Sequence, residues 1–134
     1  MITNNDIVMQ AREWVGSPFK HQGRQRVGVD CIGLVVGVMR ELGLDPYDED
    51  GYPTQPDGRL EKTLASLLEP CDVTEGALLL FRIRRDPQHV GICTGEGVIH
   101  AYSGIGKVVE HGLDDFWSKR LIKAYKLPEV LYVN

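Results

Sequence analysis

The sequence lacks several features that would place it in a specialised class of protein. Its three cysteines, Cys31, Cys71 and Cys93, are odd in number and widely spaced, which argues against a disulfide framework. No apolar run approaches the roughly 18 residues that a membrane-spanning helix needs. The formal net charge of −4 at pH 7 offers no basic footprint, so we expect no nucleic-acid partner.

The N-terminus also lacks the basic and apolar segments of a signal peptide, so we expect synthesis in a reducing cytoplasm without export by that route. The length of 134 residues predicts a single domain over 1–134. With 43% hydrophobic and 25% charged residues, the composition is that of an ordinary globular protein.

The first half of the chain has helical patterning. An amphipathic helix is predicted over 4–15, with Thr3 and Asp6 arranged as a capping box. A short helix is predicted over 60–68. The proline-bearing and aspartate-bearing segment 45–58 predicts a long irregular loop, and such loops often form functional rims.

A second helix is predicted between Asp30 as its N-cap and Gly43 just after its end. Apolar residues surround it on nearly all sides, so it should be central and buried. Gly33 and Gly37 are four residues apart on one face, where another element could approach closely.

After Gly76 the pattern changes to short strands. We predict five of them, over 77–83, 88–94, 97–102, 107–111 and 121–127. Helices followed by strands predict an α+β fold, with the helices packed against an antiparallel sheet.

Cys31 falls in the first turn of the predicted buried helix. Free backbone N–H groups and the positive end of the helix dipole favour a thiolate at this place, and the same groups could hold an oxyanion. We therefore predict that Cys31 is a nucleophile. The alternative is an inert cysteine in the core.

A base could come from a predicted hairpin. If Gly95 and Glu96 form a two-residue loop, His89 faces Tyr102, and His100 lies diagonal to His89 on the same face. His89 would then take the proton of the cysteine and His100 would orient the His89 ring. A three-residue loop would place the two histidines on opposite faces.

Other candidates are weaker. Cys31, His89 and His100 could instead be three zinc ligands, although the paired close spacings of zinc sites are missing, and we predict neither a metal nor a cofactor. Cys93 shares a strand face with His89 and is interpreted as a spectator. Cys71 is expected in a loop, and His111 on the surface.

Several segments, in order, resemble the NlpC-type cell-wall cysteine peptidases. Residues 29–35 are similar to the family's D-C-S-G-F/L-V signature and 16–20 to its G-T-P-Y segment. Residues 76–81 resemble its G-D-L-V-F-F strand, 89–92 match its H-V-G-I block, and 98–101 match its I-H-A block. The short length and residues 19–22 look most like the phage and prophage branch.

This resemblance implies a papain-like fold and cleavage of peptidoglycan stem peptides, at γ-D-glutamyl–diamino-acid bonds, by a catalytic set of Cys31, His89 and His100. It also implies association with a phage tail, whose proteins would be partners and which would carry the protein to the cell wall. Phe19 replaces a tyrosine whose hydroxyl lies near the family's active site, and Ile32 replaces a serine. The candidate substrate-binding or oxyanion residues are Asp30, Ile32, Phe19 and His21.

Two other functions stay open. A tail protein could keep the fold for assembly and lack activity, which the missing hydroxyl at Phe19 favours. A papain-like enzyme could instead be an amidase of other specificity or an acyltransferase.

Overall fold

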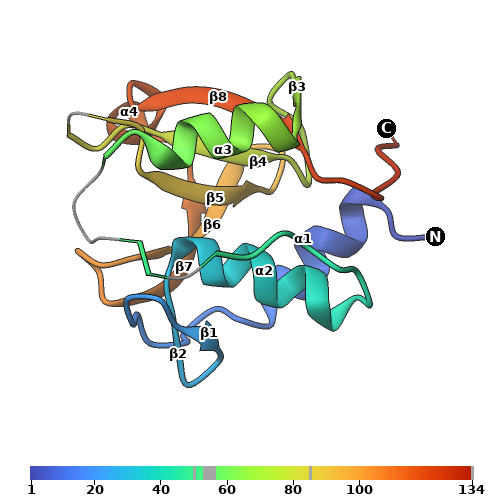
Figure 1. Cartoon of the computed structure of the whole chain (residues 1–134), viewed down its shortest axis with the longest axis horizontal. Helices are drawn as coiled ribbons and strands as arrows, with labels where there is room; N and C mark the ends of the chain where they lie inside the picture. The colour runs from blue at the N-terminus through green and yellow to red at the C-terminus, as the bar shows by residue number, and fades with distance from the viewer. Residues whose placement is uncertain (50, 53–56, 85, 134) are drawn as a thin grey trace.

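The computed structural model describes residues 1–49, 51–52, 57–84 and 86–133. It has an α+β fold in which N-terminal helices pack on a six-stranded antiparallel sheet (Figure 1). The helices are α1 (Asn4–Arg12), α2 (Cys31–Glu41), α3 (Arg59–Leu67) and α4 (Asp115–Ser118). The sheet contains β3 (Glu69–Cys71), β4 (Leu78–Phe81), β5 (His89–Cys93), β6 (Gly97–Tyr102), β7 (Lys107–Gly112) and β8 (Leu121–Lys126).

Helix α1 begins where the capping box predicts. The Thr3 Oγ1 accepts from the Asp6 amide at 3.3 Å, and the Asp6 carboxylate accepts from the Thr3 amide at 2.8 Å. The helix ends at Arg12 rather than at residue 15, because the chain tightens into a turn with an amide of Trp14 bonded to Ala11. Gly16, with φ of +95°, then reverses the chain.

Helix α2 also has the predicted caps. Asp30 accepts from the Gly33 amide at 2.7 Å, and Gly43, with φ of +83°, follows the end. The two helix glycines face close neighbours. A Cβ on Gly37 would lie 2.4 Å from the Trp14 ring, and one on Gly33 would lie 1.9 Å from the Gly23 carbonyl oxygen. Only glycine therefore allows these contacts.

The sheet has the strand order β3-β8-β4-β5-β6-β7, and its paired strands are antiparallel. The five predicted strands are confirmed with small changes at their ends. Strand β3 was not predicted, and Cys71 lies in this strand, paired with Ala124, rather than in a loop. A small hairpin of β1 (Arg24–Gln25) and β2 (Gly28–Val29) precedes α2 and was also missed.

Strand β4 alternates between two hydrophobic cores. Leu78 and Leu80 join the larger core, which is shared with α1 and α2. Leu79 and Phe81 join a smaller core, which includes Trp117 of α4. The sheet is consequently covered by apolar side chains on both faces, and its central strands are buried.

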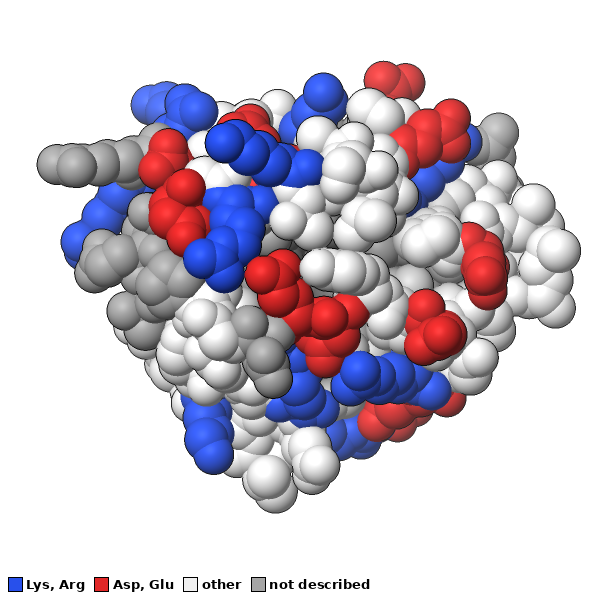
Figure 2. All heavy atoms as spheres, viewed as in Figure 1, with Lys and Arg blue, Asp and Glu red and all other residues white. Residues whose placement is uncertain are grey.

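The two ends of the chain lie side by side (Figure 1), with Thr3 bridged to Leu131. On the face seen in Figure 2, basic and acidic side chains are interspersed. Within the described ranges, no helix is both long and apolar enough to cross a membrane.

Candidate active site

The first turn of α2 is held rigidly by its N-cap residue. Both carboxylate oxygens of buried Asp30 accept hydrogen bonds: one from the Gly33 amide at 2.7 Å and the Arg24 guanidinium at 3.1 Å, the other from the Gln22 amide at 2.8 Å and the Tyr52 hydroxyl. Because four donors occupy its carboxylate oxygens, Asp30 supports the helix start and the neighbouring Cys31.

Cys31 lies at the start of α2, beside strand β5. The paired residues of β5 and β6 are Ile92 with Ile99 and Cys93 with Val98. The backbone amide of Val90, on β5, can hydrogen-bond to the Cys31 sulfur, and so can the amides of Ile32 and of Cys31 itself. The sulfur therefore lies beside the residue that follows His89 in the chain.

Cys31 and His89 line one pocket between α2, α3 and the ends of β5 and β6. The same pocket is lined by the other predicted site residues, Phe19, His21, Asp30 and Ile32. The apolar face of α3, including Leu60 and Leu64, forms a further wall. The expectation that segment 45–58 forms a rim is met by its described lining residues, which include Tyr47 and Tyr52; residues 50 and 53–56 lie outside the described part.

Three histidines form a hydrogen-bonded chain on adjacent strands. Nε2 of His89 lies 2.6 Å from Nδ1 of His100, and Nε2 of His100 lies 2.8 Å from Nε2 of His111. The far ring nitrogen of His111, Nδ1, lies 2.8 Å from the Gly112 carbonyl oxygen. These three rings run from the pocket, across one face of the sheet, to a second hollow on the surface.

The predicted hairpin register explains half of this arrangement. The pairs Ile92–Ile99 and Cys93–Val98 are those of a two-residue loop, so His89 and His100 are diagonal neighbours. The same diagonal step repeats between β6 and β7, where Val98 pairs with His111 and His100 pairs with Val109. His111 reaches the surface, as predicted, but it is half-buried and is also bonded to His100, which was not predicted.

Aromatic rings hold the histidines in place. The Trp117 ring packs edge-on against His100, with 4.7 Å between ring centroids, and it also contacts His89 and His111. Tyr102 stacks on His100 and also packs edge-on against Trp117, with 5.1 Å between the centroids of the latter two rings. His100 is fully buried, so its two ring partners satisfy the nitrogens that burial would otherwise leave unpaired.

The surroundings of Cys31 favour a neutral thiol. Burial, and then the negative charge of Asp30, raise the pKa of Cys31 to about 12, although the nearby amides of Val90 and Ile32 lower it. The sequence predicted a stabilised thiolate from the helix dipole. Desolvation outweighs that effect here, because the packed surroundings disfavour the charged form.

The two buried histidines favour their neutral forms as well. Burial, followed by His100, lowers the pKa of His89 well below its ordinary value. Burial, followed by His111, lowers the pKa of His100 to about 4. Near pH 7 the resting site thus holds an uncharged thiol and uncharged imidazoles.

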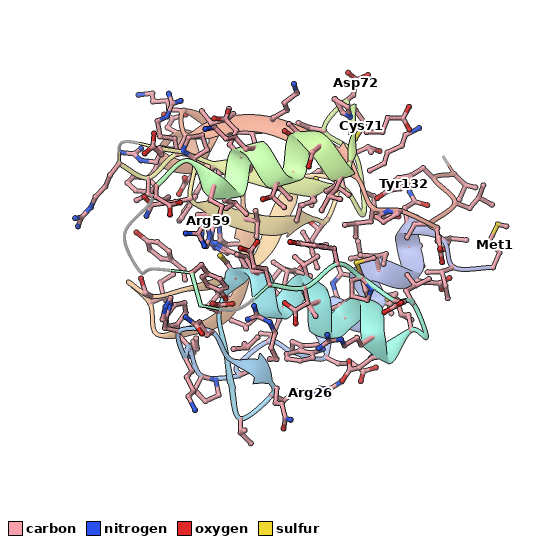
Figure 3. All side chains as sticks on the ribbon, viewed as in Figure 1. Met1, Arg26, Arg59, Cys71, Asp72 and Tyr132 are labelled. Carbon is pink, nitrogen blue, oxygen red and sulfur yellow. The ribbon has the colours of Figure 1, made fainter. Side chains whose placement is uncertain are left out.

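Other residues differ in their relation to the pocket. Cys93 is buried in the smaller core, on the strand face that it shares with His89, as the strand alternation predicted. Cys71 lies on edge strand β3 beside Asp72, away from α2 (Figure 3).

Tyr52 was missed by sequence reasoning; its hydroxyl reaches Asp30 and its carbonyl oxygen lies 3.1 Å from the His21 ring. Nothing in the polar loop around Tyr52 signals this contact.

The zinc alternative is not favoured by the side-chain arrangement. In the part of the chain that the structure describes, no three histidine, cysteine, aspartate or glutamate side chains are grouped to hold a metal ion. The ring nitrogens of His89 and His100 are bonded directly to each other instead.

Comparison with known proteins identifies relatives of the whole arrangement. The model of the NlpC/P60 family matches residues 16–126, which is more than half of the chain. The chain is 28% identical over 123 residues to a protein of Escherichia coli K12 named "Murein DD-endopeptidase MepS/Murein LD-carboxypeptidase", covering 90% of the chain and 61% of the relative. It therefore spans about three fifths of the length of this relative.

Solved structures share the fold. The NlpC/p60 domain of the peptidoglycan hydrolase SagA superposes with a TM-score of 0.68 at 22% identity, covering 94% of this chain and all of that domain. A lipoprotein-like protein of the NLP/P60 family from Staphylococcus aureus Mu50 gives 0.69 at 19% identity, covering 98% of this chain and 42% of that protein. These likenesses confirm the papain-like α+β architecture.

Proposed function

The chain belongs to the NlpC/P60 family, and from this premise we propose that it is a cysteine peptidase that hydrolyses amide bonds in peptidoglycan stem peptides. One observation carries the proposal: a helix-terminal cysteine, Cys31, shares a pocket with His89, whose ring is held by buried His100. The Escherichia coli relative is named a murein peptidase, which supports the substrate class.

The geometry supports a two-step mechanism with Cys31, His89 and His100 as its proposed catalytic set. The sulfur of Cys31 attacks the substrate carbonyl carbon while its proton passes to a ring nitrogen of His89. The negative charge on the carbonyl oxygen is stabilised by amides at the start of α2, including that of Ile32. His89 then donates the proton to the leaving amine, which leaves a thioester on Cys31.

Water completes the reaction. His89 takes a proton from water as its oxygen attacks the thioester, and the released thiolate recovers that proton, so that a carboxylic acid and free Cys31 result. Because the resting thiol and imidazole are both neutral, the ion pair forms only as the carbonyl oxygen gains charge. Substrate binding thus controls nucleophile formation in this proposal.

For the identity of the cleaved bond, the sequence resemblance favours the γ-D-glutamyl–diamino-acid bond. The name of the Escherichia coli relative instead describes DD-endopeptidase and LD-carboxypeptidase activities. These three bonds lie at different places in a stem peptide, so each cleavage releases a fragment of different mass.

Mass spectrometry of purified muropeptides tests the proposal. Wild type should release one defined stem-peptide fragment, Cys31→Ala should release none, and Cys71→Ala, which changes a cysteine outside the pocket, should match wild type. Circular dichroism should show that both variants fold. A folded Cys31→Ala variant that still cleaves the muropeptides would refute the assignment of the nucleophile.

A structural role without turnover is the second candidate. The raised pKa of Cys31 favours it, as does Phe19, which lines the pocket without a hydroxyl. With such a role, wild type should cleave no muropeptide in the same mass-spectrometric assay.

Acyl transfer is a third candidate, supported by the apolar wall that α3 contributes beside the nucleophile. Transfer to an acceptor other than water would give a product whose mass exceeds that of the hydrolysed fragment by the acceptor less water.

The finer proposal of a phage or prophage tail component rests only on the short length and on residues 19–22. The relatives described above are not named as phage proteins. Detection of the chain in purified virions by immunoblotting would support the association, and its absence from virions of a producing strain would remove it.

A further inference from the structure

The half-buried end of the histidine chain has no role in the mechanism above. His111 lies on β7, and its Nε2 is 2.8 Å from Nε2 of His100. It lines an open hollow on the surface with Glu96, Asp114 and Trp117. A residue that only filled this hollow would not need to be a histidine, so its bond to a buried ring indicates a further role.

The direction of each hydrogen bond among the three histidines follows from the last acceptor in the series, the Gly112 carbonyl oxygen. A carbonyl oxygen can only accept, so Nδ1 of His111 must carry the proton that it donates to Gly112. A neutral imidazole has one N–H, so Nε2 of His111 is then an acceptor. His100 must therefore donate from its Nε2.

The same reasoning continues to the pocket. With its proton on Nε2, His100 accepts at Nδ1, so His89 must donate to it from its own Nε2. The remaining ring nitrogen of His89, Nδ1, then carries a lone pair. That is the protonation state required of a base that accepts the thiol proton of Cys31.

We propose that His111 is a positioning residue for the reaction: it fixes the tautomer of His100, and through His100 that of His89, so that Nδ1 of His89 is unprotonated. The inference depends on the proposed function for its effect on rate, but the tautomers themselves do not. His111 contacts neither Cys31 nor the pocket lined by Cys31, so it acts only through the two buried rings.

Protonation of His111 would reverse the direction of the hydrogen bonds among the three histidines. A cationic imidazole donates from both nitrogens, so His100 would have to accept at Nε2 and carry its proton on Nδ1. His89 would then accept at Nε2 and carry its proton on Nδ1, where it could no longer act as a base. The charged groups that line the hollow with His111 are Glu96, just before β6, and Asp114, the N-cap of α4.

The direct test measures the tautomers by ¹⁵N NMR of the imidazole rings at neutral pH. With four histidines in the chain, the spectra can be assigned by single substitutions. Wild type should show Nε2–H rings at His89 and His100 and an Nδ1–H ring at His111. An Nδ1–H ring at His89 would overturn the proposal, whether or not the protein proves to be a peptidase.

Two substitutions of His111 distinguish the effect of its hydrogen-bond acceptor from the effect of its side-chain shape. His111→Leu removes the acceptor and should give mixed tautomers at His100 and His89, with kcat lowered roughly tenfold, the equivalent of one hydrogen bond, and KM little changed. His111→Gln keeps an amide oxygen that can accept from His100, so it should retain the wild-type tautomers and most of kcat. Lys107→Leu, an exposed change on the same strand, serves as the control.

The contrast between the two variants distinguishes positioning from simple packing, because packing alone does not depend on an acceptor at residue 111. Unchanged tautomers and kcat in His111→Leu, or mixed tautomers in His111→Gln, would contradict the proposal. If His111→Leu fails to fold, the tautomers of His89 and His100 in His111→Gln still decide.

Discussion

Nε2 of His89 lies 2.6 Å from Nδ1 of His100, and both rings are buried within the sheet. Such a pair is stable only while both rings stay neutral, because a buried charge would lose its hydration. The pairing thus links the chemistry of the site to the stability of the fold.

The free energy of unfolding should fall as the pH falls from about 6.5 to about 4. An unfolded histidine is protonated below about pH 6.5, whereas folded His100, whose pKa is lowered to about 4, stays neutral. The unfolded state therefore binds more protons in this window and gains up to about 1.4 kcal/mol per pH unit for each such histidine. Above pH 6.5 both states are neutral and this contribution is constant.

Urea unfolding at pH 7, 6 and 5 measures this slope. His100→Asn should show a shallower slope because it removes one buried titrating ring. A steeper or equal slope in His100→Asn would show that acid sensitivity arises elsewhere.

Alkylation of Cys31 by iodoacetamide should need a higher pH in the folded protein than in the unfolded one. Burial and Asp30 raise the pKa of Cys31 to about 12, whereas an unfolded cysteine titrates near about 8.5. Peptide mapping by mass spectrometry would follow the labelling rate from pH 7 to pH 10. A rate plateau below pH 8 would instead support the thiolate that the helix dipole alone predicts.

A matched variant isolates the charge of Asp30. Asp30→Asn keeps an N-cap side chain of similar quality but removes the negative charge beside the thiol. It should therefore label faster than wild type at a given pH. An unchanged rate would attribute the raised pKa to burial alone.

Replacing Gly37 by alanine should destabilise the protein. A Cβ at this position would lie 2.4 Å from the Trp14 ring, and overpacking of this kind costs about 1–3 kcal/mol. The better helix propensity of alanine offsets about 1 kcal/mol of that cost. Thermal or urea unfolding should place Gly37→Ala below wild type.

The control for this substitution is Gly112→Ala. Its added methyl group would meet nothing within 4 Å, so the change in the free energy of unfolding should stay within about 0.5 kcal/mol. A Gly37→Ala variant as stable as the control would show that the Trp14 ring can move aside.

Local interactions made much of the site predictable. The caps of α2 at Asp30 and Gly43, and the two-residue loop that aligns His89 with His100, depend on residues close in sequence. Cys31 was placed at a helix start for the same reason. Strand β3 was missed because it pairs with β8, more than fifty residues away, and its residues have little strand pattern of their own.

The sequence alone determined that this chain forms an α+β fold, with a cysteine at the start of a buried helix and two histidines on one face of a hairpin. The tertiary structure decided the protonation states, because desolvation depends on what packs around each group. At Cys31 this desolvation outweighs the effect of the helix dipole. It also decided that His111 joins the pair: the register between β6 and β7 aligns residues that no local pattern connects.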